Sequence, residues 1–179
     1  MIPCLNTERL ILRDWRNEDF ESYAEFLADP EVTRYLTGTP MNRPDAWRNM
    51  AMMIGHWSLR GYGMWAVERK SDHAMIGRVG LYYPEGWPAL EVGWMLGRSY
   101  WGHGYATEAA RAAMAYGFLT QGLERIVSVI HTDNKPSQAV AARLGETRGP
   151  RHDVAYGGKT FPTDVWSLGR ADWIRATGP

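Results

Sequence analysis

Two glycines near the middle of the chain are spaced to let the backbone pass close to a bulky anion. Trp101-Gly102-His103-Gly104 separates a strand-like apolar run, residues 90–96, from an alanine-rich, helix-like segment that begins at Tyr105. The first free N–H groups of such a helix point at the turn, and the helix dipole favours negative charge there. A pyrophosphate fits this arrangement. A tight strand-to-helix turn without any ligand is the commoner explanation of an isolated Gly-x-Gly.

The common nucleotide-binding signatures do not fit this turn. A Rossmann fingerprint needs a third glycine at position 107, where the chain has Thr107, and the full P-loop signature is absent from the chain. The turn therefore predicts neither a dinucleotide site of the Rossmann type nor a P-loop triphosphate site.

Two polar residues, Asn134 and Ser137, stand at the start of the next helix-like segment. Asn134 is a good N-cap for residues 134–144, Pro136 is tolerated in the first turn, and Gly145 ends the segment. Ser137 then lies in the first turn, at the positive end of the helix dipole. Asn134 and Ser137 can have a ligand role there, or they can simply cap the helix.

The elements that would position these residues alternate in type. Strands are expected at residues 10–12, 64–68, 75–83, 90–96, 124–131, 147–156 and 163–168, with a turn at Gly157-Gly158-Lys159. Helices are expected at residues 17–28, with Asn17 as N-cap, and at 45–59, 105–119 and 134–144. This order predicts one α/β domain over residues 1–179, with a mixed sheet and antiparallel meanders.

Charge and cysteine usage narrow the class of protein. Twenty basic and twenty acidic residues cancel, so no global field attracts a nucleic acid or an anionic membrane, and neither partner is expected. Residues 1–13 lack a basic leader with an apolar core, and no window approaches the ~20 apolar residues of a membrane span. The single cysteine, Cys4, cannot form an internal disulfide. These features predict a cytoplasmic protein.

Three motifs together resemble one family. Residues 101–109 look like the coenzyme A loop of GNAT N-acetyltransferases, Gln/Arg-x-x-Gly-x-Gly/Ala, with Trp101 in place of Gln or Arg. Residues 133–137 with Arg143-Leu144-Gly145 resemble the Asn-x-x-Ser helix of the family, although Glu146 replaces the usual Phe and removes its packing contact. Glu91-Val92-Gly93-Trp94 resembles the strand before the loop, and residues 7–13 are typical of the RimJ/RimL-like branch.

The resemblance implies a fold, a co-substrate and a set of contacts. The fold is the acyl-CoA N-acyltransferase fold, a central twisted mixed sheet flanked by helices. The reaction is direct acetyl transfer from acetyl-coenzyme A to a primary amine in a ternary complex, with no metal. The acceptor is a protein N-terminus or a small-molecule amine, and the protein is a monomer or a homodimer. The cofactor-binding residues implied are Trp94, Met95 and Leu96 through their backbone, Trp101, Gly102, His103, Gly104, Tyr105 and Ala106 in the loop, and Asn134 and Ser137.

Two side chains are the catalytic candidates that this resemblance implies. Glu91 is the one acid in an otherwise apolar strand, and a carboxylate can hold an ammonium group or accept its proton. An edge-strand carboxylate that faces solvent is the alternative. Ser137 is the candidate proton donor to the leaving thiolate, because the tyrosine that many members use stands at Ala141 here. Water is the other proton source.

A binding protein without chemistry is the alternative class of function, and two pairs of histidine and aspartate raise the question of a metal site. A degenerate protein of the same fold that holds coenzyme A without chemistry is the main alternative, and the presence of both Glu91 and Ser137 argues against it. His131-x-Asp133 and His152-Asp153 have no third ligand at a metal spacing, so no metal site is expected.

Overall fold

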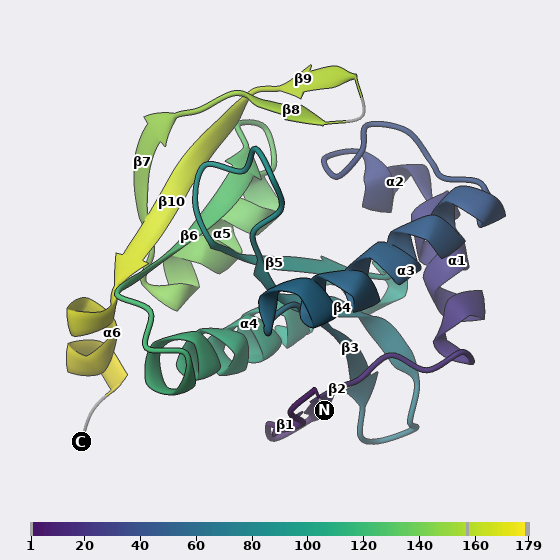
Figure 1. Cartoon of the computed structure of the whole chain (residues 1–179), viewed down its shortest axis with the longest axis horizontal. Helices are drawn as coiled ribbons and strands as arrows, with labels where there is room; N and C mark the ends of the chain where they lie inside the picture. The colour runs from purple at the N-terminus through teal and green to yellow at the C-terminus, as the bar shows by residue number, and fades with distance from the viewer. Residues whose placement is uncertain (1, 157, 178–179) are drawn as a thin grey trace.

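The computed structural model describes residues 2–156 and 158–177, without the side chain of Tyr156. Its main sheet has the strand order β1-β2-β3-β4-β5-β6-β10-β7. Every neighbouring pair is antiparallel except β5 and β6, which run parallel (Figure 1). The strands are β1 (Leu5–Asn6), β2 (Leu10–Arg13), β3 (Met64–Arg69), β4 (Met75–Tyr82), β5 (Glu91–Leu96), β6 (Arg125–His131), β7 (Thr147–Arg151) and β10 (Thr163–Gly169).

Helices flank this sheet, and a small hairpin lies outside it. The hairpin pairs β8 (Val154–Tyr156) with β9 (Lys159–Phe161). The helices are α1 (Asp19–Ala28), α2 (Pro30–Thr33), α3 (Arg43–Arg60), α4 (Tyr105–Ala115), α5 (Lys135–Leu144) and α6 (Arg170–Thr177), with a short 3-10 turn at Arg98–Tyr100. No helix in these described ranges is long and apolar enough to cross a membrane.

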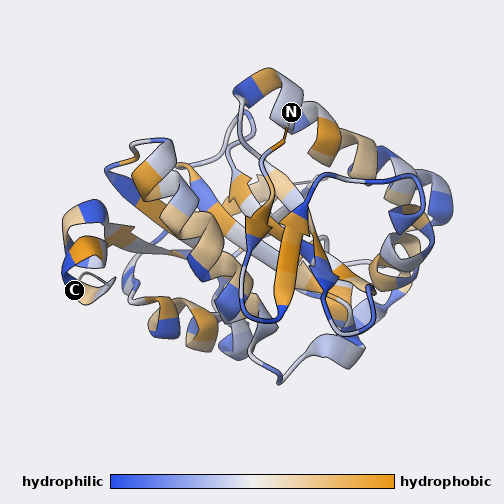
Figure 2. Ribbon diagram, turned by 90° about the horizontal axis from the view of Figure 1, so that it is seen from below, coloured by the Kyte–Doolittle hydropathy of each residue, from blue (hydrophilic) through white to orange (hydrophobic). Residues whose placement is uncertain are grey.

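Two apolar clusters pack against the main sheet, one on each face. One cluster joins β2, β4 and β5 to the alanine-rich face of α4, through Ala109, Ala110 and Ala113. The other joins the opposite sheet face to α1 and α3, through Tyr23, Met53 and Met95. Figure 2 shows the hydrophobic residues gathered on the strands and the hydrophilic residues on the loops and outer helix surfaces. A mixed sheet between helices is therefore the architecture, as the sequence predicts.

Local signals set the helix ends, with differences of a few residues from expectation. The α3 helix begins two residues early, because the Asn42 side chain accepts from the Asp45 N–H and Pro44 is tolerated in the first turn. Gly61 ends it in the left-handed conformation, at φ 75°. Asn17 is not the N-cap of α1, since Asp19 reaches back to accept from the Arg16 N–H and the helix begins there.

Two other expectations need correction. The strand expected over residues 147–156 is split between β7 and β8, where Pro150 supplies no N–H and the pairing with β10 shifts register. The helix expected to reach Leu119 ends at Ala115 and continues as a π-helical turn, Tyr116–Thr120. Gly157 of the expected turn lies outside the described residues. The sequence analysis did not predict the strands β1 and β9 or the helices α2 and α6.

Candidate active site

The parallel strands β5 and β6 meet at one point and then separate. Their register contains one pair, Glu91 with Val127, and the Val127 N–H donates to the Leu90 carbonyl at 3.1 Å. Beyond that pair, side chains replace the ladder: the Ser128 hydroxyl donates to the Val92 carbonyl at 3.0 Å, and the Val129 N–H donates to Glu91 Oε2 at 3.3 Å. Backbone groups of β5 therefore face an opening instead of a neighbouring strand.

The residues of β5 alternate between this opening and β4. Val92 turns its carbonyl to β6, so the period-two geometry of a strand turns the backbone groups of Trp94 and Leu96 the same way. The Leu96 carbonyl accepts from the Trp101 indole at 2.9 Å, which fixes Trp101 across the end of the strand. Met95 differs from expectation, because the same alternation directs its backbone to its partner Arg78 on β4. Met95 contributes its side chain to the cleft.

The glycine turn adopts the geometry that a pyrophosphate needs. Gly102 and Gly104 have φ of 78° and 81°, a left-handed conformation that favours glycine, and a side chain at Gly102 would meet no neighbour within 4 Å. Gly104 begins α4 without a side-chain cap, so the first-turn N–H groups from Tyr105 onward have no capping side chain. The turn residues line the cleft, and the donors and space there fit the phosphates of coenzyme A.

The turn is tied to the N-terminal segment by an ion pair. Arg9 Nε donates to Glu108 Oε2 at 2.7 Å, and its Nη1 donates to the His103 carbonyl at 3.0 Å. The Thr7 hydroxyl donates to the other oxygen of Glu108 at 2.6 Å. These contacts join the start of the chain to the first turn of α4 and hold the glycine turn in place.

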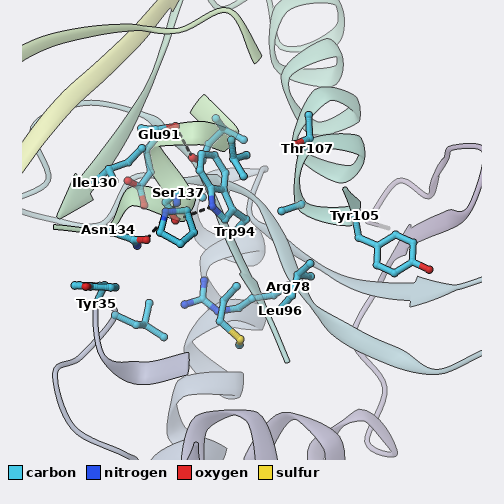
Figure 3. Close-up of a pocket in the computed structure, with 18 of the residues that line it drawn as sticks. Tyr35, Arg78, Glu91, Trp94, Leu96, Tyr105, Thr107, Ile130, Asn134 and Ser137 are labelled. Atoms are coloured by element: carbon cyan, nitrogen blue, oxygen red, sulfur yellow. Dashed lines mark hydrogen bonds between the residues drawn. The ribbon is translucent and has the colours of Figure 1, made fainter. Parts of the chain in front are cut away.

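The start of α5 places Asn134 and Ser137 in the same cleft. The Asn134 side chain accepts from the Ser137 N–H at 3.2 Å, so Asn134 is the N-cap, as its sequence position predicts. The Ser137 hydroxyl oxygen accepts from the Trp94 indole at 3.2 Å (Figure 3). Its own proton remains able to point into the cleft, at the positive end of the helix dipole.

Glu91 is buried, at 8% exposure, and lines the cleft. Burial raises the pKa of its carboxyl to about 7, against smaller lowering contributions from the nearby Trp87 indole, the Val129 N–H and Arg78. The Trp87 N–H lies near Glu91 without meeting hydrogen-bond geometry. Glu91 is therefore not the solvent-facing carboxylate of the alternative interpretation, and its pKa suits proton exchange near neutral pH.

A second buried acid lies close by and was missed from the sequence. Glu146, at 4% exposure, shares a 3.1 Å hydrogen bond with the Ser128 hydroxyl, which also contacts the Val92 carbonyl. The Ser128 hydroxyl has one proton for two acceptors, the Val92 carbonyl and Glu146 Oε1, and a neutral Glu146 would satisfy both contacts by donating to Ser128 while Ser128 donates to Val92. Burial and the neighbouring Glu91 raise the pKa of Glu146 to about 8, in agreement with that neutral form. Only its place after Leu144-Gly145, where the family has Phe, marked the position.

The His131-x-Asp133 pair is engaged within its own turn. His131 Nδ1 accepts from the Asp133 N–H at 3.1 Å. Among the described residues, no group of three or more histidine, cysteine or acidic side chains could hold a metal ion.

One cleft of about 1680 Å³ is lined by all the catalytic and cofactor-binding candidates that the sequence predicts. The β5 residues, the glycine turn, the start of α5 and Glu91 all line it, although they come from three separate parts of the chain. An elongated co-substrate can contact the turn and the parted strands at once. Arg78 and Ser128 also line the cleft, although sequence reasoning did not select them, and Glu146 contacts Ser128 without lining the cleft itself.

Comparison with known proteins agrees with this geometry. The acetyltransferase (GNAT) domain family matches residues 9–147. An uncharacterized N-acetyltransferase, p20 of Bacillus licheniformis, is 37% identical over 135 residues, 74% of this chain and 76% of its own. The crystal structure of an acetyltransferase from Agrobacterium tumefaciens is 32% identical with a TM-score of 0.82, over 94% of this chain and 95% of that one.

A more distant structure shares the fold alone. RimL, described as a ribosomal L7/L12 alpha-N-protein acetyltransferase in complex with coenzyme A, has a TM-score of 0.77 at 18% identity, over 93% of this chain and 98% of that one. The family match covers well over half of the chain. This protein belongs to the GNAT acetyltransferase family and is an N-acetyltransferase.

Proposed function

We propose that the protein transfers an acetyl group from acetyl-coenzyme A directly to a primary amine, with Glu91 as the base and Ser137 as the proton donor. The observation that carries the proposal is Glu91, a buried carboxyl with a pKa of about 7, at the point where β5 and β6 part. It lies in one cleft with the glycine turn and the start of α5.

Acetyl-coenzyme A supplies an activated thioester. The backbone N–H groups of the glycine turn and of the first turn of α4 hold its phosphates, and the β6-facing backbone of Trp94 and Leu96 binds its pantetheine arm. Asn134 caps α5 and so sets the position of Ser137.

Proton transfer is divided between the two side chains. The Glu91 carboxylate takes a proton from the acceptor ammonium and passes it to solvent. The freed amine then forms its bond to the acetyl carbon while the carbon–sulfur bond breaks, and the nitrogen loses its second proton to Glu91. The Ser137 hydroxyl gives its proton to the leaving sulfur, and solvent returns a proton to Ser137. The positive end of the α5 dipole stabilises negative charge on the sulfur.

We also propose that the chain is one cytoplasmic domain of the RimJ/RimL-like branch. The opening typical of that branch supports this, because Thr7 and Arg9 contact Glu108 in the first turn of α4. An exposed, unpaired Cys4 suits a reducing compartment.

The experiment is release of free thiol from acetyl-coenzyme A in the presence of a panel of amines, with mass spectrometry of the amine products. The proposal expects acetylated product and thiol in equal amounts for at least one amine class, and none without amine. Binding of acetyl-coenzyme A with no product across the panel would contradict transfer and favour the degenerate coenzyme A-binding protein.

A further inference from the structure

Arg78 is a buried arginine that no carboxylate pairs with in the described part of the chain. It is 6% exposed, its Nε has no hydrogen-bond partner, and no acidic group lies within ion-pair distance of it. Arg13 is the matched contrast. At 7% exposure, it pairs with Asp19 at 2.7 Å and with Glu68 at 2.6 Å. A buried charge without a partner is costly, so Arg78 needs another source of negative charge.

Arg78 lies on the same face of the sheet as Glu91. It is paired with Ala66 and Met95, whose side chains belong to the apolar cluster under α1 and α3. Glu91 is paired with Tyr82 of the same cluster. Arg78 and Tyr82 are four residues apart on β4, about 13 Å along the strand, with Gly80 between them.

The Arg78 side chain extends into the cleft. Figure 3 shows its guanidinium on the side of the pocket where Tyr35 lies, below Asn134 and Ser137. Arg78 is close enough to Glu91 to lower the pKa of that carboxyl, but the two groups form no ion pair. Three other acids line the cleft, and none pairs with Arg78: Glu108 binds Arg9, Glu31 lies 3.9 Å from Arg34, and Glu8 is exposed on the N-terminal segment.

The co-substrate phosphates have their own donors on the opposite face. The glycine turn opens into α4, which packs on the face formed by Val79, Leu81 and Val92. An acceptor that binds Glu91 on the face of the sheet covered by α1 and α3 also lies beside Arg78. A guanidinium binds carboxylates through two parallel hydrogen bonds, and Arg78 lies in the same cleft as Glu91 and close enough to lower its pKa, so one small molecule can present its amine to Glu91 and its anionic group to Arg78.

We propose that Arg78 binds a carboxylate of the acceptor, which makes the substrate a small amine that also carries an acid group, as an amino acid does. This assignment rests on the proposed function, in which Glu91 receives the ammonium group of the same molecule. Arg78 is then the residue that determines acceptor specificity.

The first test compares three acceptors with the same side chain: an α-amino acid, its carboxamide and its aminophosphonate. The amide has the less basic amine, so chemistry alone favours the amide. The wild type should nevertheless have the higher kcat/KM for the amino acid. Arg78→Met should lower that preference about a hundredfold, as expected for loss of one partner of a buried charged pair. Arg78→Lys keeps the positive charge but loses the two parallel N–H donors of the guanidinium, so it should retain part of the preference for the amino acid.

Equal kcat/KM for acid and amide in the wild type, or an unchanged preference in Arg78→Met, would overturn the assignment. A higher kcat/KM for the aminophosphonate than for the amino acid would also overturn the carboxylate and replace it with a phosphorus oxyacid. If acetyl-coenzyme A raised the melting temperature of Arg78→Met less than that of the wild type, Arg78 would bind the co-substrate, and this result would contradict the proposal.

The second test does not depend on turnover and so separates the two proposals. The amino acid alone should raise the melting temperature of the wild type more than its amide does, and Arg78→Met should abolish that difference. This result with no thiol release would contradict acetyl transfer and leave the Arg78 site supported. No difference between the two ligands in the wild type would contradict the Arg78 site itself.

A matched pair of variants tests whether Arg78 has a structural role instead. Arg78→Met removes an unpaired buried charge and should leave the melting temperature equal or higher. Arg13→Met leaves Asp19 buried without a cation and removes the buried partner of Glu68, so it should lower the melting temperature by many degrees. An equal loss in both variants would show that Arg78 stabilises the fold, and would overturn the proposal.

Discussion

The indole N–H of Trp94 on β5 donates a 3.2 Å hydrogen bond to the hydroxyl oxygen of Ser137 in the first turn of α5. The bond joins β5, one of the two strands that separate, to the helix α5. Because the oxygen accepts from the indole, the hydroxyl proton of Ser137 is the part of the group that can face the cleft. The orientation suits a proton donor better than a proton acceptor.

Ser137→Ala should therefore lower turnover by roughly ten- to a thousandfold, the range for loss of a general acid or one strong donor to the transition state. Acetyl-coenzyme A affinity, measured by titration, should change little. Asn134→Ala is the informative comparison, because it removes the cap and should lower stability by about 1 kcal/mol while the hydroxyl stays. Wild-type turnover in Ser137→Ala would make water the proton source.

Gly104→Val should abolish the rise in melting temperature that acetyl-coenzyme A produces. At φ 81° the variant strains the backbone and adds a side chain where the phosphates approach, next to the guanidinium of Arg9 at 3.5 Å. Gly61→Val is the matched control, at φ 75° with no neighbour within 4 Å and at the end of α3. It should lose similar stability and keep the ligand shift. An intact shift in a folded Gly104→Val would mean that the phosphates bind elsewhere.

Glu146 should make the protein less stable as the pH rises. Burial raises the folded-state pKa of Glu146 from 4.5 to about 8. Between these two values the unfolded chain has lost the proton that the native state keeps. The free energy of unfolding should thus fall by up to about 1.4 kcal/mol per pH unit for this group. The stability that neutral Glu146 contributes is fully present below its unfolded-state pKa and is lost as the pH rises through its folded-state pKa.

Glu146→Gln mimics the neutral acid and should flatten this part of the profile, as measured by urea unfolding at a series of pH values. Glu85→Gln, at an exposed loop position, serves as the control and should leave the slope alone. The same slope in Glu146→Gln as in the wild type would show that Glu146 is ionised in the native protein and that Ser128 is oriented differently.

Much of the fold was predictable because its signals are local. The apolar runs of β3, β4 and β5 are bounded by glycine, proline and polar turns, and their ends fell within one or two residues of expectation. The α6 helix gave no such signal, since it buries one hydrophobic residue, Trp173, against a cluster formed by distant elements. Its helical state depends on tertiary contacts that no local pattern carries.

The site divides in the same way. The glycine turn and the Asn134 cap have geometries that their own residues dictate, so their local structure could be predicted from spacing, whereas a ligand role was indicated only by the resemblance of the motifs to a known family. Arg78 and Glu146 matter because of what surrounds them. Arg78 is one charge in an apolar strand, and its lack of a partner exists only in three dimensions. Glu146 acquires its raised pKa from burial and from Glu91, against a smaller lowering by Ser128, and these surroundings come together only in the folded chain.

The pH–rate profile of wild type and Glu91→Gln, with one accepted amine, tests the central claim most directly. A carboxyl with a pKa of about 7 must lose its proton to act as a base, so the wild-type rate should rise with pH and level off above that value. Glu91→Gln should lose this limb and fall in kcat, because an amide cannot take a proton. A higher KM with an unchanged profile would reduce Glu91 to an anchor for the ammonium group. Overlapping curves with equal KM would remove Glu91 from the site and contradict the account.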